Sequence, residues 1–215
     1  AAKHQSFFDI ILICSVTPRP RFIMKKELKW APMLGWYALR IGCVPVDRGK
    51  KGRAIAEMKQ AVANNPAGPG QLIIYPQGTR VAPEVVMPYK VGAGLLYQQL
   101  GQPCVPAATN VGIFWPRHGI LRKPGLAVVE FLPVIAPGLG VAEFTAQLER
   151  VVETNSDRLM AEARLGPSRL AGAYAWRSID NGVPIEFDLR GGTLQFGIDQ
   201  ASPFAPTTAQ LLDPA

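Results

Sequence analysis

A histidine and an aspartate near the start of the chain, His4 and Asp9, stand five residues apart. On one continuous helix this spacing is a rotation of about 140°, so the two side chains would not share a face. The pair can meet if His4 lies in a loop and Asp9 in the first helical turn, and Ser6 with Asp9 has the Ser-x-x-Asp pattern of a capping box. Asp9 would then hold one imidazole nitrogen and leave the other free to take a proton from a hydroxyl. The alternative is a helix cap beside a surface histidine.

A second polar cluster, Tyr75-Pro-Gln-Gly-Thr-Arg80, follows the apolar run of residues 71–75. A Pro/Gly turn at the end of a buried strand presents backbone N–H groups and side chains together at a sheet edge. Gly78 permits close approach of a ligand to the backbone, and the Arg80 guanidinium can bind phosphate through two nitrogens. The alternative is an ordinary tight turn with a solvated arginine.

Two further clusters have the same arrangement of a strand pattern followed by polar residues. They are Gly42-Cys-Val-Pro-Val-Asp-Arg48 and Val105-Pro-Ala-Ala-Thr-Asn110. Each is weak when taken alone, because short strands often end in polar turn residues.

The elements that must position these clusters alternate between helix and strand. Strand patterns occur at residues 21–24, 42–46, 71–75, 104–108 and 126–132, and helical patterns at residues 7–16, 30–41, 53–64, 91–100 and 141–165. The alternation predicts an α/β domain over residues 1–165, with a layered central sheet and flanking helices.

The composition changes after residue 165. Gly166 and Pro167 end the last helix, and the remainder is rich in Gly, Pro, Ala and Thr. We expect residues 166–215 to form a C-terminal tail, with a hairpin of residues 185–189 and 193–198 and a disordered end from residue 201. We assign no chemistry to this tail.

The composition excludes a disordered chain, because 48% of the 215 residues are hydrophobic and 18% are charged. The three cysteines (Cys14, Cys43 and Cys104) are too few for a disulfide framework and lack zinc-ligand spacing, which predicts inert thiols in a reducing environment. No apolar run reaches the roughly 18 residues of a membrane-spanning helix. The chain opens without an initiator Met, so we expect an N-terminal piece to precede it.

The net charge of +7 is uneven: residues 1–165 carry +9 and residues 166–215 carry −2. A phosphorylated small molecule, an acidic bilayer or nucleic acid would suit the positive part, and plain solubility is the alternative. The basic residues are scattered and no recognition motif is present, which argues against nucleic acid.

In this order and spacing the four clusters resemble the sequence blocks of the glycerophospholipid acyltransferases, the 1-acyl-sn-glycerol-3-phosphate acyltransferase family. Residues 4–9 match a His-x4-Asp block, residues 42–48 a block ending in Asp-Arg, residues 75–80 a Phe-Pro-Glu-Gly-Thr-Arg block and residues 105–110 a Val-Pro block. Residues 30–37 are similar to the segment between the first two blocks. The resemblance covers about residues 1–164, and it implies the fold of this family.

The resemblance implies a fatty acyl transfer from acyl-CoA or acyl-acyl carrier protein (acyl-ACP) to the free hydroxyl of 1-acyl-sn-glycerol 3-phosphate, giving phosphatidic acid. His4 is then the general base and Asp9 orients it, with neither a metal nor a cofactor. The expected phosphate-binding residues are Arg80, Thr79, Gly78 and Arg48. The expected residues of the acceptor or acyl pocket are Gln77, Val105 and Pro106.

Members of the family usually carry a membrane-binding helical element before the first block, which is missing from these residues. We therefore expect a membrane-associated protein at the cytoplasmic face. Residues 25–30 and the apolar residues after them mix cations with aromatic side chains, which suits an anionic bilayer interface. A basic loop leading into a core helix is the alternative.

Other functions stay open at this point. The acceptor could be another lysolipid or glycerol 3-phosphate. Gln77 stands where the family block has Glu, which leaves room for a non-catalytic lipid-binding homologue.

Overall fold

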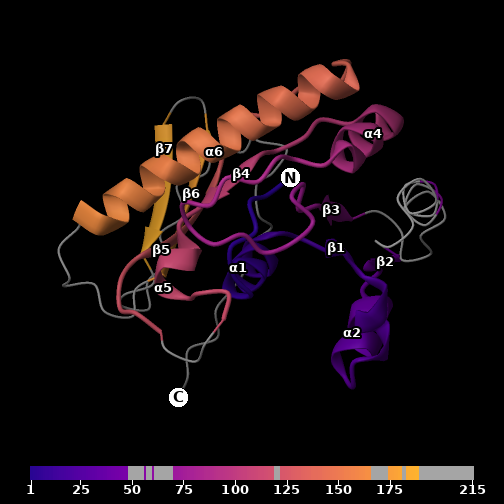
Figure 1. Cartoon of the computed structure of the whole chain (residues 1–215), viewed down its shortest axis with the longest axis horizontal. Helices are drawn as coiled ribbons and strands as arrows, with labels where there is room; N and C mark the ends of the chain where they lie inside the picture. The colour runs from indigo at the N-terminus through magenta and orange to yellow at the C-terminus, as the bar shows by residue number, and fades with distance from the viewer. Residues whose placement is uncertain are drawn as a thin grey trace.

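The structure of the chain is a computed structural model that describes residues 1–47, 56, 60, 70–118, 122–165, 174–180 and 183–188. Its elements in chain order are α1 (Phe8–Val16), β1 (Pro20–Lys25), the 3-10 helix η1 (Lys26–Trp30), α2 (Leu34–Arg40), β2 (Val44–Val46), β3 (Gln71–Ile73), α4 (Val91–Leu100), β4 (Ala107–Thr109), α5 (Val111–Phe114), β5 (Ala127–Phe131), α6 (Val141–Leu165), β6 (Tyr174–Asp180) and β7 (Val183–Asp188). Figure 1 shows their arrangement.

The strands form two sheets. One has the order β2-β1-β3 with parallel neighbours, and the other has the order β4-β5-β6-β7. In the second sheet β5 and β6 are parallel, whereas β4 pairs with β5 and β6 pairs with β7 in the antiparallel sense. The carboxyl ends of β1, β2 and β3 therefore meet at a common edge.

Residues 1–3 lie between the two sheets and join them. The backbone N–H of Ala2 donates to the carbonyl of Ile74 at 2.9 Å, and that of Lys3 donates to the carbonyl of Ala107 at 3.0 Å. Ala2 and Ala107 also form a parallel β-bridge. The opening residues thus serve as a short extra strand, and the layered central sheet expected from the sequence is assembled through them.

Helices cover both faces of this sheet, and β5 shows why. Val129 packs with Leu12 and Ile13 of α1, while its neighbour Val128 packs with Leu159 of α6. Successive side chains of a strand point to opposite faces, so an apolar run such as Ala-Val-Val needs a cover on each side. In Figure 1 the long helix α6 runs along one side of β4 and α1 lies on the other.

A buried ion pair fastens the opening segment to α6. The Lys3 ammonium is 2% exposed and bonds the Glu153 carboxylate, which also accepts a 2.9 Å hydrogen bond from the Tyr89 hydroxyl. Burial, together with the charge of Glu153, raises the pKa of Tyr89, so this hydroxyl stays protonated and donates. The residue directly before His4 is therefore held by groups distant in sequence.

The expected helix over residues 30–41 is wrong at its start. Residues 26–30 form η1, the chain turns at Pro32 and Met33, and α2 begins at Leu34. Proline disfavours helical geometry in the residue before it, and Ala31 is accordingly extended with ψ 124°. Gly42 ends α2 as expected of a glycine, at φ +83°, with the N–H of Cys43 bonded to the carbonyl of Ala38.

Two other expectations differ from the structure in position. The strand placed at residues 104–108 begins at Ala107, and Cys104 forms only an isolated bridge with Ile135. The hairpin lies earlier than expected, as β6 and β7, because a tyrosine- and tryptophan-containing run at residues 174–180 supplies its first strand. Residues 193–198 lie outside the described residues, as does the helix expected at 53–64 apart from residues 56 and 60.

Within the described residues, none of the helices combines the length and the apolar character that crossing a bilayer requires.

Replacing Glu153 with Ala should lower the free energy of unfolding by about 3–5 kcal/mol, because it leaves the Lys3 ammonium buried without its partner. Denaturant unfolding measures this loss. Asp157→Ala is the matched control, since Asp157 is exposed on the same helix and should change stability by no more than about 0.5 kcal/mol. Equal stabilities for the two variants would contradict a structural role for the pair.

Candidate active site

His4 and Asp9 are in direct contact. The Nδ1 atom of His4 lies 2.9 Å from Oδ1 of Asp9, and the aspartate side chain is buried while the His4 side chain is 13% exposed. An ionised carboxylate only accepts hydrogen bonds, so Nδ1 carries the proton and Nε2 keeps a lone pair. This is the arrangement of a general base, with the second nitrogen not engaged by the carboxylate.

The start of α1 has only half of the expected capping box: the Asp9 carboxylate accepts the N–H of Ser6, but the N-cap is Phe7, and Ser6 bonds the N–H of Phe8 rather than that of Asp9. The other oxygen of Asp9, Oδ2, accepts the backbone N–H groups of Gln5 and Ser6 at 2.8 Å each, and Oγ of Ser6 accepts the N–H of Phe8 at 3.2 Å. The carboxylate also lies in the first turn of α1, where the helix dipole favours negative charge. Local sequence therefore places Asp9 behind the imidazole.

Tyr75 holds the flat face of the imidazole. Its ring stacks on that of His4 with centroids 4.0 Å apart and an angle of 19° between the planes. The phenol is buried beside Asp9, and burial together with that negative charge raises the pKa of Tyr75 well above its usual range. A neutral aromatic ring thus fixes the orientation of His4 without competing for its proton.

The turn after β3 lies against His4. The N–H of Gly78 donates to the carbonyl of Tyr75 at 2.8 Å, which makes a β-turn with Pro76 at its second position. Gly78 has φ +71°, a conformation suited to glycine. The N–H of Val81 then donates to the carbonyl of His4 at 2.7 Å, so Thr79 and Arg80 are brought next to the histidine.

Positive side chains gather at this turn. Nη1 of Arg80 donates to the carbonyl of Arg117 at 3.4 Å, and Nη1 of Arg117 donates to the carbonyl of Arg80 at 2.9 Å. A Cβ atom built on Gly78 would lie 2.7 Å from Nζ of Lys90, so this ammonium rests on the turn. Three cations therefore surround the backbone of residues 78–80 and can bind an anion such as a phosphate.

Sequence reasoning missed Lys90, Arg117 and the role of Tyr75. Lys90 precedes α4 and is tied to the turn by its N–H, which donates to the carbonyl of Pro76 at 3.0 Å. Arg117 lies in the loop after α5. Nothing in the local sequence of either residue indicates proximity to Arg80, because Lys90 reaches back from the start of α4 and Arg117 comes from the loop after α5.

The remaining expected site residues lie elsewhere. Gln77 is 1% exposed, and its Nε2 donates to the carbonyl of Met87 at 3.4 Å, so it points into the protein rather than into a pocket. Arg48 lies outside the described residues. Among the described residues, no group of His, Cys, Asp and Glu side chains could hold a metal ion.

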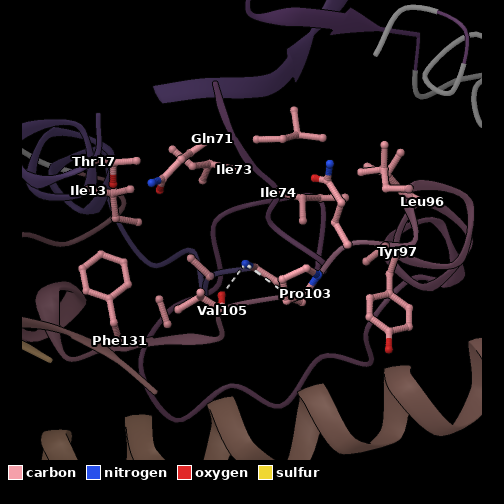
Figure 2. A pocket seen from close by; sticks show the side chains of 18 of the residues that line it. Ile13, Thr17, Gln71, Ile73, Ile74, Leu96, Tyr97, Pro103, Val105 and Phe131 are labelled. Atoms are coloured by element: carbon pink, nitrogen blue, oxygen red, sulfur yellow. Dashed lines mark hydrogen bonds between the residues drawn. The ribbon is translucent and has the colours of Figure 1, made fainter. Parts of the chain in front are cut away.

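Val105 lines an apolar cavity of about 300 Å³ between the opening residues, β3, α4 and β4, and Pro106 does not. Figure 2 shows Ile74, Leu96, Tyr97 and Phe131 around this cavity, with the N-terminal nitrogen bonded to Val105. The catalytic candidates His4 and Asp9 are not among its lining residues. Pro106 is instead buried beside β5, where its carbonyl accepts the N–H of Leu132 at 2.9 Å.

Comparison with known proteins identifies relatives. The chain is 31% identical over 140 residues to the 1-acyl-sn-glycerol-3-phosphate acyltransferase of Saccharomyces cerevisiae, and 26% identical over 162 residues to the Pseudomonas aeruginosa protein of the same name. These alignments cover 63% and 75% of this chain but only 46% and 63% of the two relatives. The fold matches the crystal structure of the 1-acyl-sn-glycerophosphate (LPA) acyltransferase PlsC from Thermotoga maritima, with a TM-score of 0.62 and 26% identity over 74% of this chain and 65% of that one.

The family model described as Acyltransferase matches residues 1–110, a range that contains His4, Asp9 and the turn of residues 75–80. With its fold and the geometry of its site, the chain thus belongs to the acyltransferase family.

Proposed function

We propose that this chain is the catalytic part of an enzyme that acylates 1-acyl-sn-glycerol 3-phosphate to phosphatidic acid. The observation that carries the proposal is the His4–Asp9 pair, in which the imidazole is partly exposed and adjoins a turn surrounded by cations. A base and an anion site side by side suit an acceptor that has both a hydroxyl and a phosphate. The two relatives and the T. maritima structure carry names of this same activity.

The chemistry is a direct transfer between a thioester and an alcohol. Nε2 of His4 takes the proton of the acceptor hydroxyl while its oxygen attacks the thioester carbon. The C–S bond then breaks, an ester bond forms, and the imidazolium returns the proton to the leaving thiolate of CoA or ACP. Asp9 stabilises the transient imidazolium through the 2.9 Å hydrogen bond to Nδ1.

The phosphate of the acceptor is proposed to bind at residues 78–80. Arg80 provides a planar guanidinium, and Lys90 and Arg117 add positive charge beside it. Holding the phosphate there positions the hydroxyl within reach of His4, and such positioning accounts for a large share of the barrier reduction in two-substrate reactions.

We place the reaction at the cytoplasmic face of a membrane, where a lysolipid acceptor and acyl-CoA or acyl-ACP meet. The cysteines Cys14, Cys43 and Cys104 are all free thiols, which suits a reducing compartment. The apolar cavity beside Val105 has the lining to take a hydrocarbon chain.

A non-catalytic lipid-binding homologue is the second candidate, because Gln77 replaces the Glu of the family block. The position of Gln77 argues for the enzyme. Its amide is buried and donates to a carbonyl, so the missing charge is not directed at the substrate, and the hydrogen bond to Met87 requires a donor that Glu lacks.

His4→Ala should lower the rate of acyl transfer by about 10²- to 10⁴-fold, the usual contribution of a general base. The assay follows phosphatidic acid by mass with acyl-CoA as donor. His118→Ala is the matched control, because His118 is the other histidine of the chain and is exposed. Near-normal turnover without His4 would reject the mechanism.

Arg80→Lys keeps the charge but loses the two-pronged guanidinium, so kcat/KM for 1-acyl-sn-glycerol 3-phosphate should fall about 10- to 100-fold. A monoacylglycerol, which lacks the phosphate, should be used equally well by both proteins. Arg150→Lys on the exposed side of α6 serves as control. An equal loss of kcat/KM with both acceptors would show that Arg80 does not recognise the phosphate.

Gln77→Glu should lower the free energy of unfolding by about 1–3 kcal/mol at neutral pH, because it buries a carboxylate against a carbonyl. Burial raises a carboxyl pKa above its unfolded value of about 4.3, so the variant should match the wild type below that pH and weaken as the pH rises. Thermal unfolding across a pH series tests this. A variant as stable as the wild type at neutral pH would show that the side chain is not confined.

A further inference from the structure

Large apolar side chains are concentrated on the surface of η1 and α2. Of the thirteen exposed large hydrophobic residues in the described part of the chain, seven lie between residues 28 and 39. The most exposed of them are Met33 at 86%, Trp30 at 78% and Trp36 at 66%. We call this the η1–α2 surface: Leu28, Trp30, Met33, Leu34, Trp36, Tyr37 and Leu39.

The usual relation of a helix to its core is reversed here. The buried residues of α2 are Gly35 and Ala38, so the smallest side chains face the protein and the large ones face outward. A core helix, the alternative considered for this segment, would bury its aromatic face. Monomeric soluble proteins rarely expose a contiguous group of this kind, and such groups mark interaction sites.

The backbone is strained where the surface protrudes most. Met33 has φ +60° and ψ −51°, and the N–H of Leu34 donates to the carbonyl of Pro32 at 2.6 Å across it. This is a γ-turn of the rare positive-φ form, which a methionine adopts only at a cost in conformational energy. The Met33 side chain is 86% exposed, so burial against the described residues does not offset this cost.

The segment is nevertheless firmly built. A Cβ atom on Gly35 would lie 2.2 Å from the carbonyl oxygen of Lys29, so α2 packs directly on the backbone of η1. The glycine cap at Gly42 ends the helix, and the N–H of Cys43 bonds the carbonyl of Ala38. The apolar side chains are therefore presented on a fixed platform rather than on a loop.

Cations border the apolar side chains. The ammonium of Lys29 lies 4.6 Å from the ring centroid of Trp30, and the guanidinium of Arg40 lies 5.3 Å from that of Trp36. Lys25 and Lys26 are also exposed, and Glu27, which pairs with Lys25, is the single acid of residues 25–40. Tryptophan, tyrosine and lysine or arginine together are the side chains that favour the headgroup region of an anionic bilayer.

The η1–α2 surface lies at the same edge of the β2-β1-β3 sheet as the candidate active site. It follows directly from the carboxyl end of β1, which runs parallel to β3, with Phe22 opposite Ile73. The turn of residues 75–80 follows β3 at this same edge, so the surface and the candidate site share one edge of the small sheet. In Figure 1 α2 projects from this sheet, away from α6.

We infer that the η1–α2 surface is the element that seats this protein on an anionic phospholipid bilayer, with Trp30, Met33 and Trp36 entering the interface and Lys26, Lys29 and Arg40 at the headgroups. The inference rests on the proposed function in one respect, that the acceptor is a lipid drawn from that bilayer. A second copy of this chain is the other possible occupant.

The experiment is flotation of the full chain with phosphatidylcholine vesicles, with and without phosphatidylserine. Binding should need the anionic lipid and weaken as salt is added. Lys26→Gln and Lys29→Gln should each reduce the partition coefficient about fivefold. Met33→Asp should abolish flotation, whereas Val134→Asp, which changes an exposed valine in the segment after β5, should leave it unchanged.

Two measurements keep the result independent of folding. Met33→Gly relieves the positive φ, so it should be at least as stable as the wild type while losing most of its vesicle binding. Brominated phosphatidylserine should quench the tryptophan fluorescence of the wild type and of Trp115→Phe, but not of the double variant Trp30→Phe, Trp36→Phe.

The outcomes separate this inference from the proposed function. His4→Ala should float like the wild type, and the surface variants should keep their turnover of acceptor dispersed in detergent. Unchanged flotation of Met33→Asp and Met33→Gly would overturn the inference even if acyl transfer is found. A mass that falls from dimer to monomer in these variants, with vesicle binding intact, would assign the surface to a second copy and overturn it equally.

Discussion

The structure of the site depends on one buried carboxylate. Asp9 accepts three hydrogen bonds, from the imidazole of His4 and from the backbone N–H groups of Gln5 and Ser6. A buried charge is tolerated only when such partners replace its lost hydration. The bonds that make Asp9 acceptable inside the protein are also those that begin α1 and set the tautomer of His4. Local folding and the chemistry of the histidine are therefore inseparable at this position.

The position of that pair in space is decided by the opening residues. Ala2 and Lys3 join the two sheets through backbone hydrogen bonds, and the Lys3 side chain reaches α6 through Glu153. His4 follows immediately, at the point where this short strand meets the turn after β3. Because this segment is bonded to both sheets and to α6, the imidazole has little conformational freedom. A base that is already oriented loses little entropy in the reaction.

These relations show what the sequence could predict and what it could not. The bond from the Asp9 carboxylate back to Ser6 and the turn of residues 75–80 are local, so the spacing of Ser6, Asp9 and Gly78 was enough to predict them, whereas the N-cap itself lies one residue later, at Phe7. Lys90 and Arg117 reach the turn through contacts between distant segments, which periodicity and turn chemistry do not encode. Gln77 was expected in the pocket because it belongs to the matched block, but the side chain directly before Gly78 can face the interior, and this one does. The prediction of one helix over residues 30–41 was wrong because Pro32 interrupts the helix despite the apolar pattern on either side of it.

The break at Pro32 also explains why large apolar side chains are exposed on η1 and α2, beside the β2-β1-β3 sheet. In an unbroken helix starting at Trp30, the large side chains would point in all directions around the helix axis, and some of them would be buried against the protein. The break at Pro32 and Met33 turns α2 so that Gly35 and Ala38 face inward, leaving the aromatic residues outside at the edge that also carries the cations of the site. A lysolipid has its chain in a bilayer and its phosphate at the surface, so apolar side chains and cations on one side of a protein suit such an acceptor. The parallel order of β1 and β3 supplies that arrangement, because both features follow the carboxyl ends of neighbouring strands.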